Sequence, residues 1–129
     1  LLLQAREAVM VHTRPSLRAH GLSDQQWRVL RVLGEHGTVE TGRVAREAFI
    51  LGPSLTGVLA RMERDGLIRR ERDSADQRVV RVSITDLGRA LVEKILPAHV
   101  AGIVADFSIL TPDEQETLAA LCRKLGTGR

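Results

Sequence analysis

The chain has 129 residues and a mass of 14.2 kDa, the size of one ordinary domain. Its content of 43% hydrophobic and 27% charged residues is typical of a globular protein and argues against a disordered chain. Aromatic residues make up only 2%, so the core must be aliphatic, and aromatic platforms for single-stranded nucleic acid are nearly excluded. The net charge is +3, and residues 43–84 carry nine cations against six anions. This distribution indicates an anionic partner for the middle third of the chain.

Cysteine and histidine usage narrows the chemistry further. The single cysteine, Cys122, excludes an internal disulfide and a multi-cysteine metal site, and its spacing with leucines predicts a packed thiol in the core or at a dimer interface. The four histidines lack metal-ligand spacing, and neither a reactive pair nor a Gly-rich phosphate loop is visible. We therefore expect no metal, no cofactor and no catalytic site. No apolar run approaches the ~20 residues that span a bilayer, and no cleavable signal is visible, so we expect a cytoplasmic protein.

The predicted elements begin with two helices. Helical spacing of apolar residues predicts the first over residues 1–20, and Pro15 should bend or break it. Ser23 followed by Gln26 is a capping-box pattern, which predicts the start of the second helix. That helix should end near Gly37.

A pair of short helices follows. Residues 38–40 are β-prone, and Thr41 is placed to cap a brief helix over 41–48. A Gly-Pro pair interrupts the helical pattern, and Pro53 suits the first position of the next helix, over 53–65. Two helices joined by a tight turn predict a helix-turn-helix.

The apolar period then changes from helical to alternating. Residues 67–72 and 79–84 predict two strands that form a hairpin with a charged tip. Thr85 should cap a long helix that Pro97 kinks. A second capping box begins the last helix, which Gly126 should end.

Two parts of this arrangement suit a DNA surface. Arg78 lies at the hairpin tip, and arginine is the residue that a narrow minor groove attracts. The polar face of the helix 53–65 has short side chains near its N-terminus, which permit close approach to base edges, and arginines further along that could reach a guanine or a phosphate. The candidates on this face are Ser54, Thr56, Gly57, Arg61 and Arg64. On spacing alone, a solvated helix face and a solvated turn remain the alternative.

Two segments resemble a known family. Asp76-Gln77-Arg78, followed by Val82-Ser83-Ile84-Thr85 and Gly88, resembles the D-x-R…V-x-L-T-x-x-G wing signature of the MarR family of winged helix-turn-helix regulators. The segment Arg61-Met62-Glu63-Arg64-Asp65-Gly66-Leu67-Ile68 resembles the end of the family's recognition helix. The resemblance covers residues 1–125. It implies a mainly α fold with a small β wing.

The resemblance also implies a homodimer that binds a pseudo-palindromic promoter in double-stranded DNA. The family's wing roles carry over to Asp76, which would brace the wing, and to Arg78, which would enter the minor groove. The chain would be a single MarR-type domain over 1–129. Its parts would be dimerisation helices at 1–20 and 86–129 and a winged helix-turn-helix at 23–84, with the recognition helix at about 53–65 and the wing at about 67–84.

Within the family, the second helix and the start of the recognition helix most resemble regulators of homoprotocatechuate degradation. Members that respond to phenolic acids use a crevice beside the dimer helices, and one of them lines it with an acidic residue, a Trp and an Arg at the spacing of Asp24, Trp27 and Arg31. Trp27 would supply a flat wall and an N–H donor, and Arg31 would hold a carboxylate. Such a relative also uses a Tyr of the long helix, whereas this chain has no Tyr. A core Trp and a surface Arg remain the alternative.

The function expected from these observations is ligand-responsive regulation of transcription. The chain would repress an aromatic-acid catabolic operon, and a small aromatic carboxylate would release it from its operator. The alternative of another class is a winged-helix protein-interaction module without DNA binding, which would not require Arg78 at the hairpin tip. An enzyme would require a reactive pair, which the sequence does not offer.

Overall fold

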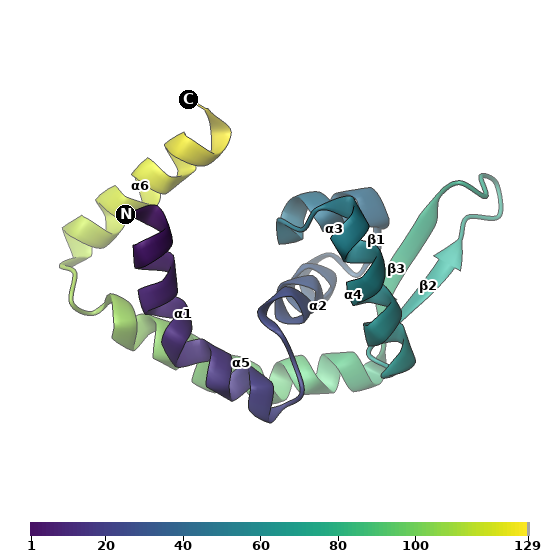
Figure 1. Ribbon diagram of the computed structural model, residues 1–129, viewed down its shortest axis with the longest axis horizontal. Coiled ribbons are helices and arrows are strands. Elements are labelled where there is room, and N and C mark those ends of the chain that lie inside the picture. The colour runs from purple at the N-terminus through teal and green to yellow at the C-terminus, as the bar shows by residue number, and fades with distance from the viewer. Residues whose placement is uncertain (129) are drawn as a thin grey trace.

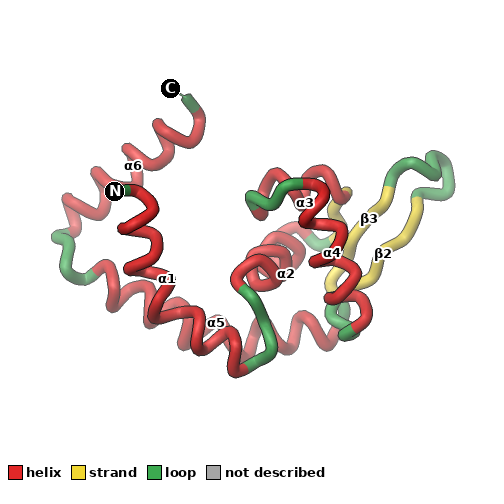
Figure 2. The backbone as a smooth tube through the Cα atoms, in the orientation of Figure 1, coloured by secondary structure: helices red, strands yellow, loops and turns green. Residues whose placement is uncertain are grey.

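Helices account for most of the backbone, and the strands form one small sheet (Figures 1 and 2). The computed structural model describes residues 1–128, and α2, α3 and α4 gather with the strands into one lobe, whereas α1, α5 and α6 extend away from it. This mainly α architecture with a β wing confirms the expected fold class. In chain order the elements are α1 (Leu2–Ala19), α2 (Asp24–His36), β1 (Thr38–Glu40), α3 (Thr41–Ala48), α4 (Gly52–Arg64), β2 (Ile68–Arg72), β3 (Val80–Ile84), α5 (Asp86–Phe107) and α6 (Pro112–Thr127).

The lobe is held together by an aliphatic core beneath a three-stranded antiparallel sheet. The strand order is β1-β3-β2, so the β-prone segment at 38–40 does form a strand and pairs with the far arm of the hairpin. Burial of these side chains supplies the main driving force for folding of the lobe. The most buried residues of the lobe come from α2, α3, α4, β2 and β3: Val29, Leu30, Leu33, Val44, Val58, Leu59, Met62, Ile68 and Val82.

The helices begin at the capping residues predicted from the sequence, with one exception. Ser23 accepts a hydrogen bond from the Gln26 N–H at 3.1 Å, and Gln26 accepts one from the Ser23 N–H at 2.9 Å, which completes the predicted capping box. The predicted capping box at the start of α6 is likewise present. Thr41 is not a cap, because Glu40 takes that position without a side-chain bond and Thr41 is the first helical residue. Helix α4 begins at Gly52, one residue before the expected Pro53.

Three helices continue past a residue that was expected to bend, break, kink or end them. Pro15 lies inside α1, Pro97 lies inside α5, and α6 passes Gly126. A proline removes the hydrogen bond to the carbonyl four residues earlier, which here belongs to Val11 or Glu93. Both residues are exposed, and each helix continues past its proline, α1 to Ala19 and α5 to Phe107.

The start of α5 is fixed against the base of the wing. A Cβ atom on Gly88 would lie 2.3 Å from the carbonyl oxygen of Leu67, so only glycine fits there. The Thr85 hydroxyl donates to the Gly66 carbonyl at 2.6 Å, and the Thr85 N–H donates to the Leu67 carbonyl at 3.1 Å. These contacts set the direction in which α5 leaves the lobe.

The helices outside the lobe leave much apolar surface uncovered. Leu17 of α1 and Ile95 of α5 are buried, but α6 has no buried residue, and Cys122 on it is exposed rather than packed in the core of this subunit. Across residues 1–128 no single helix is long and apolar enough to cross a membrane. Helices α5 and α6 reach the required length and apolar content only when taken together, and the pair is bent by 105°. The large exposed apolar residues of α1, α5, the turn after it and α6 are Leu2, Leu3, Val11, Leu87, Val100, Val104, Ile109, Leu118, Leu121 and Leu125.

Candidate functional site

The outward face of α4 carries the small and cationic side chains expected of a recognition helix. Its opposite face is buried in the core, which fixes the helix and leaves the polar face open. The Thr56 hydroxyl donates to the Gly52 carbonyl at 3.3 Å, and the Arg64 side chain is 71% exposed. All five sequence-predicted residues of this helix are exposed or half-buried: Ser54, Thr56, Gly57, Arg61 and Arg64.

An ion pair ties the end of α4 to the wing. The Glu63 carboxylate accepts hydrogen bonds from Arg70 Nη2 at 2.9 Å, Nε at 3.3 Å and the backbone N–H at 3.0 Å. The side-chain bonds from Arg70, followed by the backbone bond, hold the pKa of Glu63 below its ordinary value. The pair fixes the angle between helix and hairpin. Sequence reasoning missed it, because a contact between a helix end and a strand follows no local period.

At the wing tip Arg78 is left open to solvent, with 92% of its side chain exposed. Asp76 accepts from Arg78 Nε at 3.1 Å, from Nη2 at 3.2 Å and from the Arg78 backbone N–H at 3.1 Å. The Arg78 side chain, and then its backbone bond, lower the pKa of Asp76. Asp76 therefore orients Arg78 while leaving the outer side of the guanidinium free.

A second aspartate, missed in the sequence, braces the two strands of the wing. Asp73 accepts from the Ala75 N–H at 2.8 Å and from Arg81 Nη2 at 2.9 Å, and its own N–H donates to the Val79 carbonyl at 2.9 Å. The Ala75 backbone bond and then the Arg81 bond lower the pKa of Asp73. The Asp-Ser-Ala run is a typical turn that an aspartate side chain closes, and this was the available signal.

A cavity of about 370 Å³ lies where α1, α2 and α5 meet, and it brings together Asp24, Trp27 and Arg31. The Arg31 guanidinium carbon lies 5.8 Å from the centroid of the Trp27 ring, within range of a cation–π contact. No carboxylate among residues 1–128 pairs with Arg31. Arg31 thus has no ion-pair partner, although Glu35 and Glu47 also line the cavity. The apolar lining comes from Val9, Met10, Val32, Phe49 and Ile103.

The Trp27 N–H was expected to donate to a ligand in this cavity, but it is already bonded within the protein. Its Nε1 donates to His99 Nε2 at 3.2 Å, and the two ring centroids are 4.9 Å apart. Burial, with a contribution from Arg31, lowers the pKa of His99 and favours the neutral imidazole that can accept this bond. Sequence reasoning missed His99, because it lies on α5, 72 residues after Trp27.

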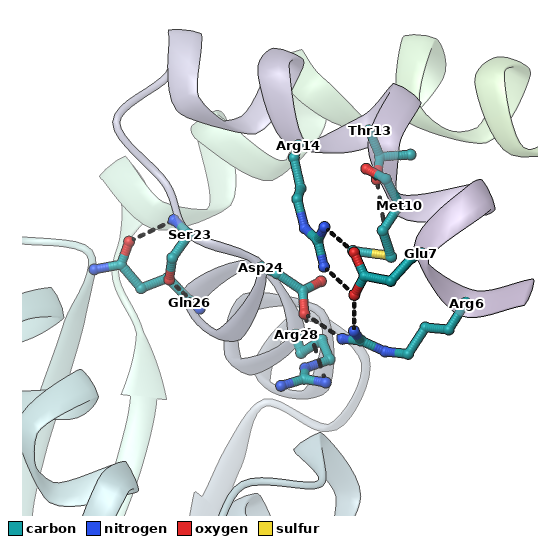
Figure 3. A network of polar contacts seen from close by, with 9 residues as sticks. All are labelled: Arg6, Glu7, Met10, Thr13, Arg14, Ser23, Asp24, Gln26 and Arg28. Atoms are coloured by element: carbon teal, nitrogen blue, oxygen red, sulfur yellow. Dashed lines mark hydrogen bonds and ion pairs between the residues drawn. The ribbon is translucent and has the colours of Figure 1, made fainter. Parts of the chain in front are cut away.

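Asp24 lies in a charged network between α1 and α2 (Figure 3). Its Oδ2 accepts from Arg6 Nη2 at 3.1 Å and lies 3.6 Å from Arg28 Nη1. Across residues 1–128 its Oδ1 has no hydrogen-bond partner. Asp24 thus connects the two helices and keeps one acceptor oxygen. The sequence did not indicate Arg6, because 18 residues separate the pair.

Helices α3 and α4 form a helix-turn-helix, and the β2–β3 hairpin lies beside α4. This arrangement defines the winged helix-turn-helix class. The chain matches the model of the MarR family over residues 20–79. It is 48% identical over 93 residues to the homoprotocatechuate degradative operon repressor of Escherichia coli, covering 72% of this chain and 63% of that protein. It is also 48% identical over 94 residues to the HTH-type transcriptional regulator FarR of Neisseria gonorrhoeae, covering 73% and 64%. The chain spans less than two thirds of the length of these relatives.

Solved structures give the same assignment over nearly the whole chain. NadR in complex with 4-hydroxyphenylacetate matches at a TM-score of 0.82 and 40% identity, covering 96% of this chain and 88% of that one. A MarR family regulator from Streptomyces coelicolor in complex with DNA matches at 0.92 and 27% identity, covering 98% and 82%. This chain belongs to the MarR family, as its wing signature indicated.

Proposed function

We propose that the chain is a DNA-binding transcription regulator that represses an aromatic-acid catabolic operon and is released by a small phenolic acid. The observation that carries the DNA-binding part is the open polar face of α4 beside a wing whose Arg78 is 92% exposed. Family membership supports regulation, and the name of the Escherichia coli relative supports repression of a catabolic operon.

In this proposal α4 enters the major groove, because its exposed N-terminal half has only small side chains. Ser54, Thr56 and Gly57 would approach base edges, while Arg61 and Arg64 reach a guanine or a phosphate. The Glu63–Arg70 pair would keep the wing at a fixed angle to α4. Arg78 would then exchange part of its contact with Asp76 for the negative potential of the minor groove.

Two copies of the chain would bind one operator. The uncovered apolar residues on α1, α5 and α6 favour a dimer interface there, because a soluble subunit rarely leaves a surface of this kind open. A two-fold dimer places two recognition helices on successive turns of the duplex, which explains a pseudo-palindromic operator. The 1–20 and 86–129 segments would serve as dimerisation helices.

The cavity at Trp27 would hold the inducer. An aryl ring would pack against Trp27, its carboxylate would bind the unpaired Arg31 guanidinium, and a ring hydroxyl would donate to Asp24 Oδ1. The 4-hydroxyphenylacetate complex of NadR supports this class of ligand. The inducer would then favour a separation of the two lobes that the operator does not fit. A coupling of about 1–3 kcal/mol would change promoter occupancy by about 5- to 150-fold.

A fluorescence anisotropy titration tests the DNA-binding part of the proposal. The probe is a labelled duplex from the region upstream of the gene, with a scrambled duplex of the same composition as control. Tighter binding to the upstream duplex, reversed by 4-hydroxyphenylacetate, is expected. Absence of binding to both duplexes would instead favour a protein-interaction module, and equal binding to both would mean that the upstream region holds no operator for this protein.

A further inference from the structure

Phe49 has a backbone conformation that an aromatic residue rarely adopts. Its φ of 55° and ψ of 48° place it in the left-handed region, where it is the only residue other than glycine among residues 1–128. Its side chain is also left 85% exposed in the subunit. The left-handed backbone ends α3 and lets the Ile50 N–H bond to the Ala45 carbonyl, a position that glycine usually takes. This capping role does not require an exposed aromatic ring, so the choice of phenylalanine points to a function of the ring.

Phe49 lines the same cavity as Trp27 and Arg31. Its backbone, in contrast, belongs to the turn of the helix-turn-helix, where Phe49 is the C-cap of α3. Only Ile50 separates it from Leu51, the N-cap of α4. One residue therefore connects the candidate ligand cavity directly to the recognition helix.

The neighbours of Phe49 make the turn stiff. Ile50 is buried, and its N–H donates to the Ala45 carbonyl at 3.0 Å. The Leu51 carbonyl accepts from the Leu55 N–H at 2.9 Å, so α4 begins immediately afterwards. Phe49 thus lies at the point where α3 ends and α4 begins, so a change in its φ and ψ would alter the angle between the two helices.

We propose that Phe49 closes the aryl-acid cavity and transmits its occupancy to the recognition helix, an inference that rests on the proposed function. An aryl ring bound beside Trp27 would cover the exposed Phe49 ring. The left-handed conformation is unfavourable for phenylalanine, so the proposal includes a second state of the turn in which Phe49 leaves it. A ligand contact made in only one of these two states would shift the balance between them. The aryl class of ligand suits an aromatic wall of this kind.

The test uses the full chain with 4-hydroxyphenylacetate as the probe. Calorimetry gives the affinity for the acid, and anisotropy gives the affinity for the operator duplex with and without saturating acid. The variants are Phe49→Ala and Phe49→Gly, which both remove the ring, although only glycine adopts the left-handed conformation freely. Leu51→Ala is the matched control, since Leu51 lies in the same turn, is 80% exposed and does not line the cavity.

We expect both Phe49 variants to bind the acid about 3- to 10-fold more weakly, the range of a lost aromatic contact. At saturating acid they should also lose most of the change in operator affinity, whereas Leu51→Ala should retain the affinity for the acid. Phe49→Gly with wild-type acid affinity and wild-type response would overturn the inference and leave the proposed function standing. A wild-type protein that does not bind the acid would overturn both the inducer class and the inference.

Discussion

At the residue scale, the placement of single arginines decides which ligands the lobe can hold. Arg78 is open to solvent at the wing tip, and Arg31 stands over Trp27 without a carboxylate partner among residues 1–128. Arg78 pairs with the neighbouring Asp76 and still stays exposed, whereas Arg70 and Arg81 join separate segments of the lobe through their ion pairs. The proposed contacts with phosphate and with an aryl carboxylate thus rest on the guanidinium groups that the fold leaves available.

Replacing Arg78 with Ala should weaken operator binding by about 1–3 kcal/mol and reduce the slope of log affinity against log salt by about one per subunit. The reason is the loss of one cationic contact in the minor groove at each wing. Anisotropy at several salt concentrations measures both quantities. Arg123→Ala on α6 removes the same charge away from the lobe and serves as the control. Unchanged operator binding of Arg78→Ala at physiological salt would mean that the hairpin is not a DNA-binding wing.

The Arg31→Ala variant should bind the operator like the wild type and no longer respond to an aryl acid. Loss of a charge-assisted carboxylate contact should cost about 1.5–3 kcal/mol of ligand affinity. Calorimetry with 4-hydroxyphenylacetate measures this, and the uncharged analogue 4-hydroxyphenylacetamide is the matched control, since it lacks the carboxylate that Arg31 would hold. Equal affinity of both proteins for the acid would remove Arg31 from the site.

His99 gives the stability a pH dependence whose sign follows from its lowered pKa. The unfolded chain binds the proton at higher pH than the folded one, so the free energy of unfolding falls as the pH drops below the ordinary value of 6.5. Trp27, the single Trp of the chain, reports unfolding by its fluorescence. Between about pH 7.5 and pH 5.5 the wild type should lose more stability than His99→Gln, which can still accept from Trp27 without titrating. Equal losses would show that His99 does not titrate differently in the folded state.

At the element scale, a few contacts set the angles between helices and wing. The Glu63–Arg70 pair joins α4 to β2, and Gly88 allows α5 to begin against the Leu67 carbonyl. The angle between α4 and the wing depends on the first contact, and the direction of α5 depends on the second.

Substituting Gly88 with Ala should destabilise the fold by about 2–3 kcal/mol, because a backbone carbonyl at 2.3 Å cannot move aside like a flexible side chain. Urea unfolding followed by Trp27 fluorescence measures the change. Gly34→Ala is the matched control, since Gly34 is a helical glycine with no atom within 4 Å of its Cβ position. It should stabilise α2 by about 0.5–1 kcal/mol. Similar effects of the two substitutions would contradict the close approach at Gly88.

At the scale of the whole molecule, the uncovered helices require a partner in the proposal. Helix α6 buries no residue within its own subunit, and Leu118, Leu121 and Leu125 all remain exposed on it. An isolated subunit of this kind would expose apolar surface along its entire C-terminal helix.

Sedimentation equilibrium at micromolar protein should therefore give about 28 kDa, twice the subunit mass of 14.2 kDa. The Leu121→Glu variant should shift the equilibrium toward monomer or unfolded chain, because it places a charge in the interface. A folded monomer of the unmodified chain would contradict the dimeric architecture.

Local signals in the sequence determined the elements and the family. The capping pairs at Ser23 and Thr111 worked because each needs only residues three positions apart. The alternating strands and the wing signature were equally local. Asp24, Trp27 and Arg31 were grouped by the resemblance to a ligand-responsive member of the family, and their helical spacing agrees with it, because side chains three and four residues apart share one face. Pro15 does not end α1, which continues to Ala19, because local sequence alone does not decide whether a proline breaks a helix.

The tertiary structure alone decided what surrounds those residues. It placed His99 on Trp27, Arg6 on Asp24 and Arg70 on Glu63, pairs that no sequence period connects. It also placed Phe49 in a left-handed turn that its residue type does not favour. The sequence alone thus determined the family, helix α4 and the wing, because these follow from patterns over a few neighbouring residues. Whether a polar side chain has a hydrogen-bond or ion-pair partner was decided only by the packing of distant helices, because such partners lie far away in the sequence.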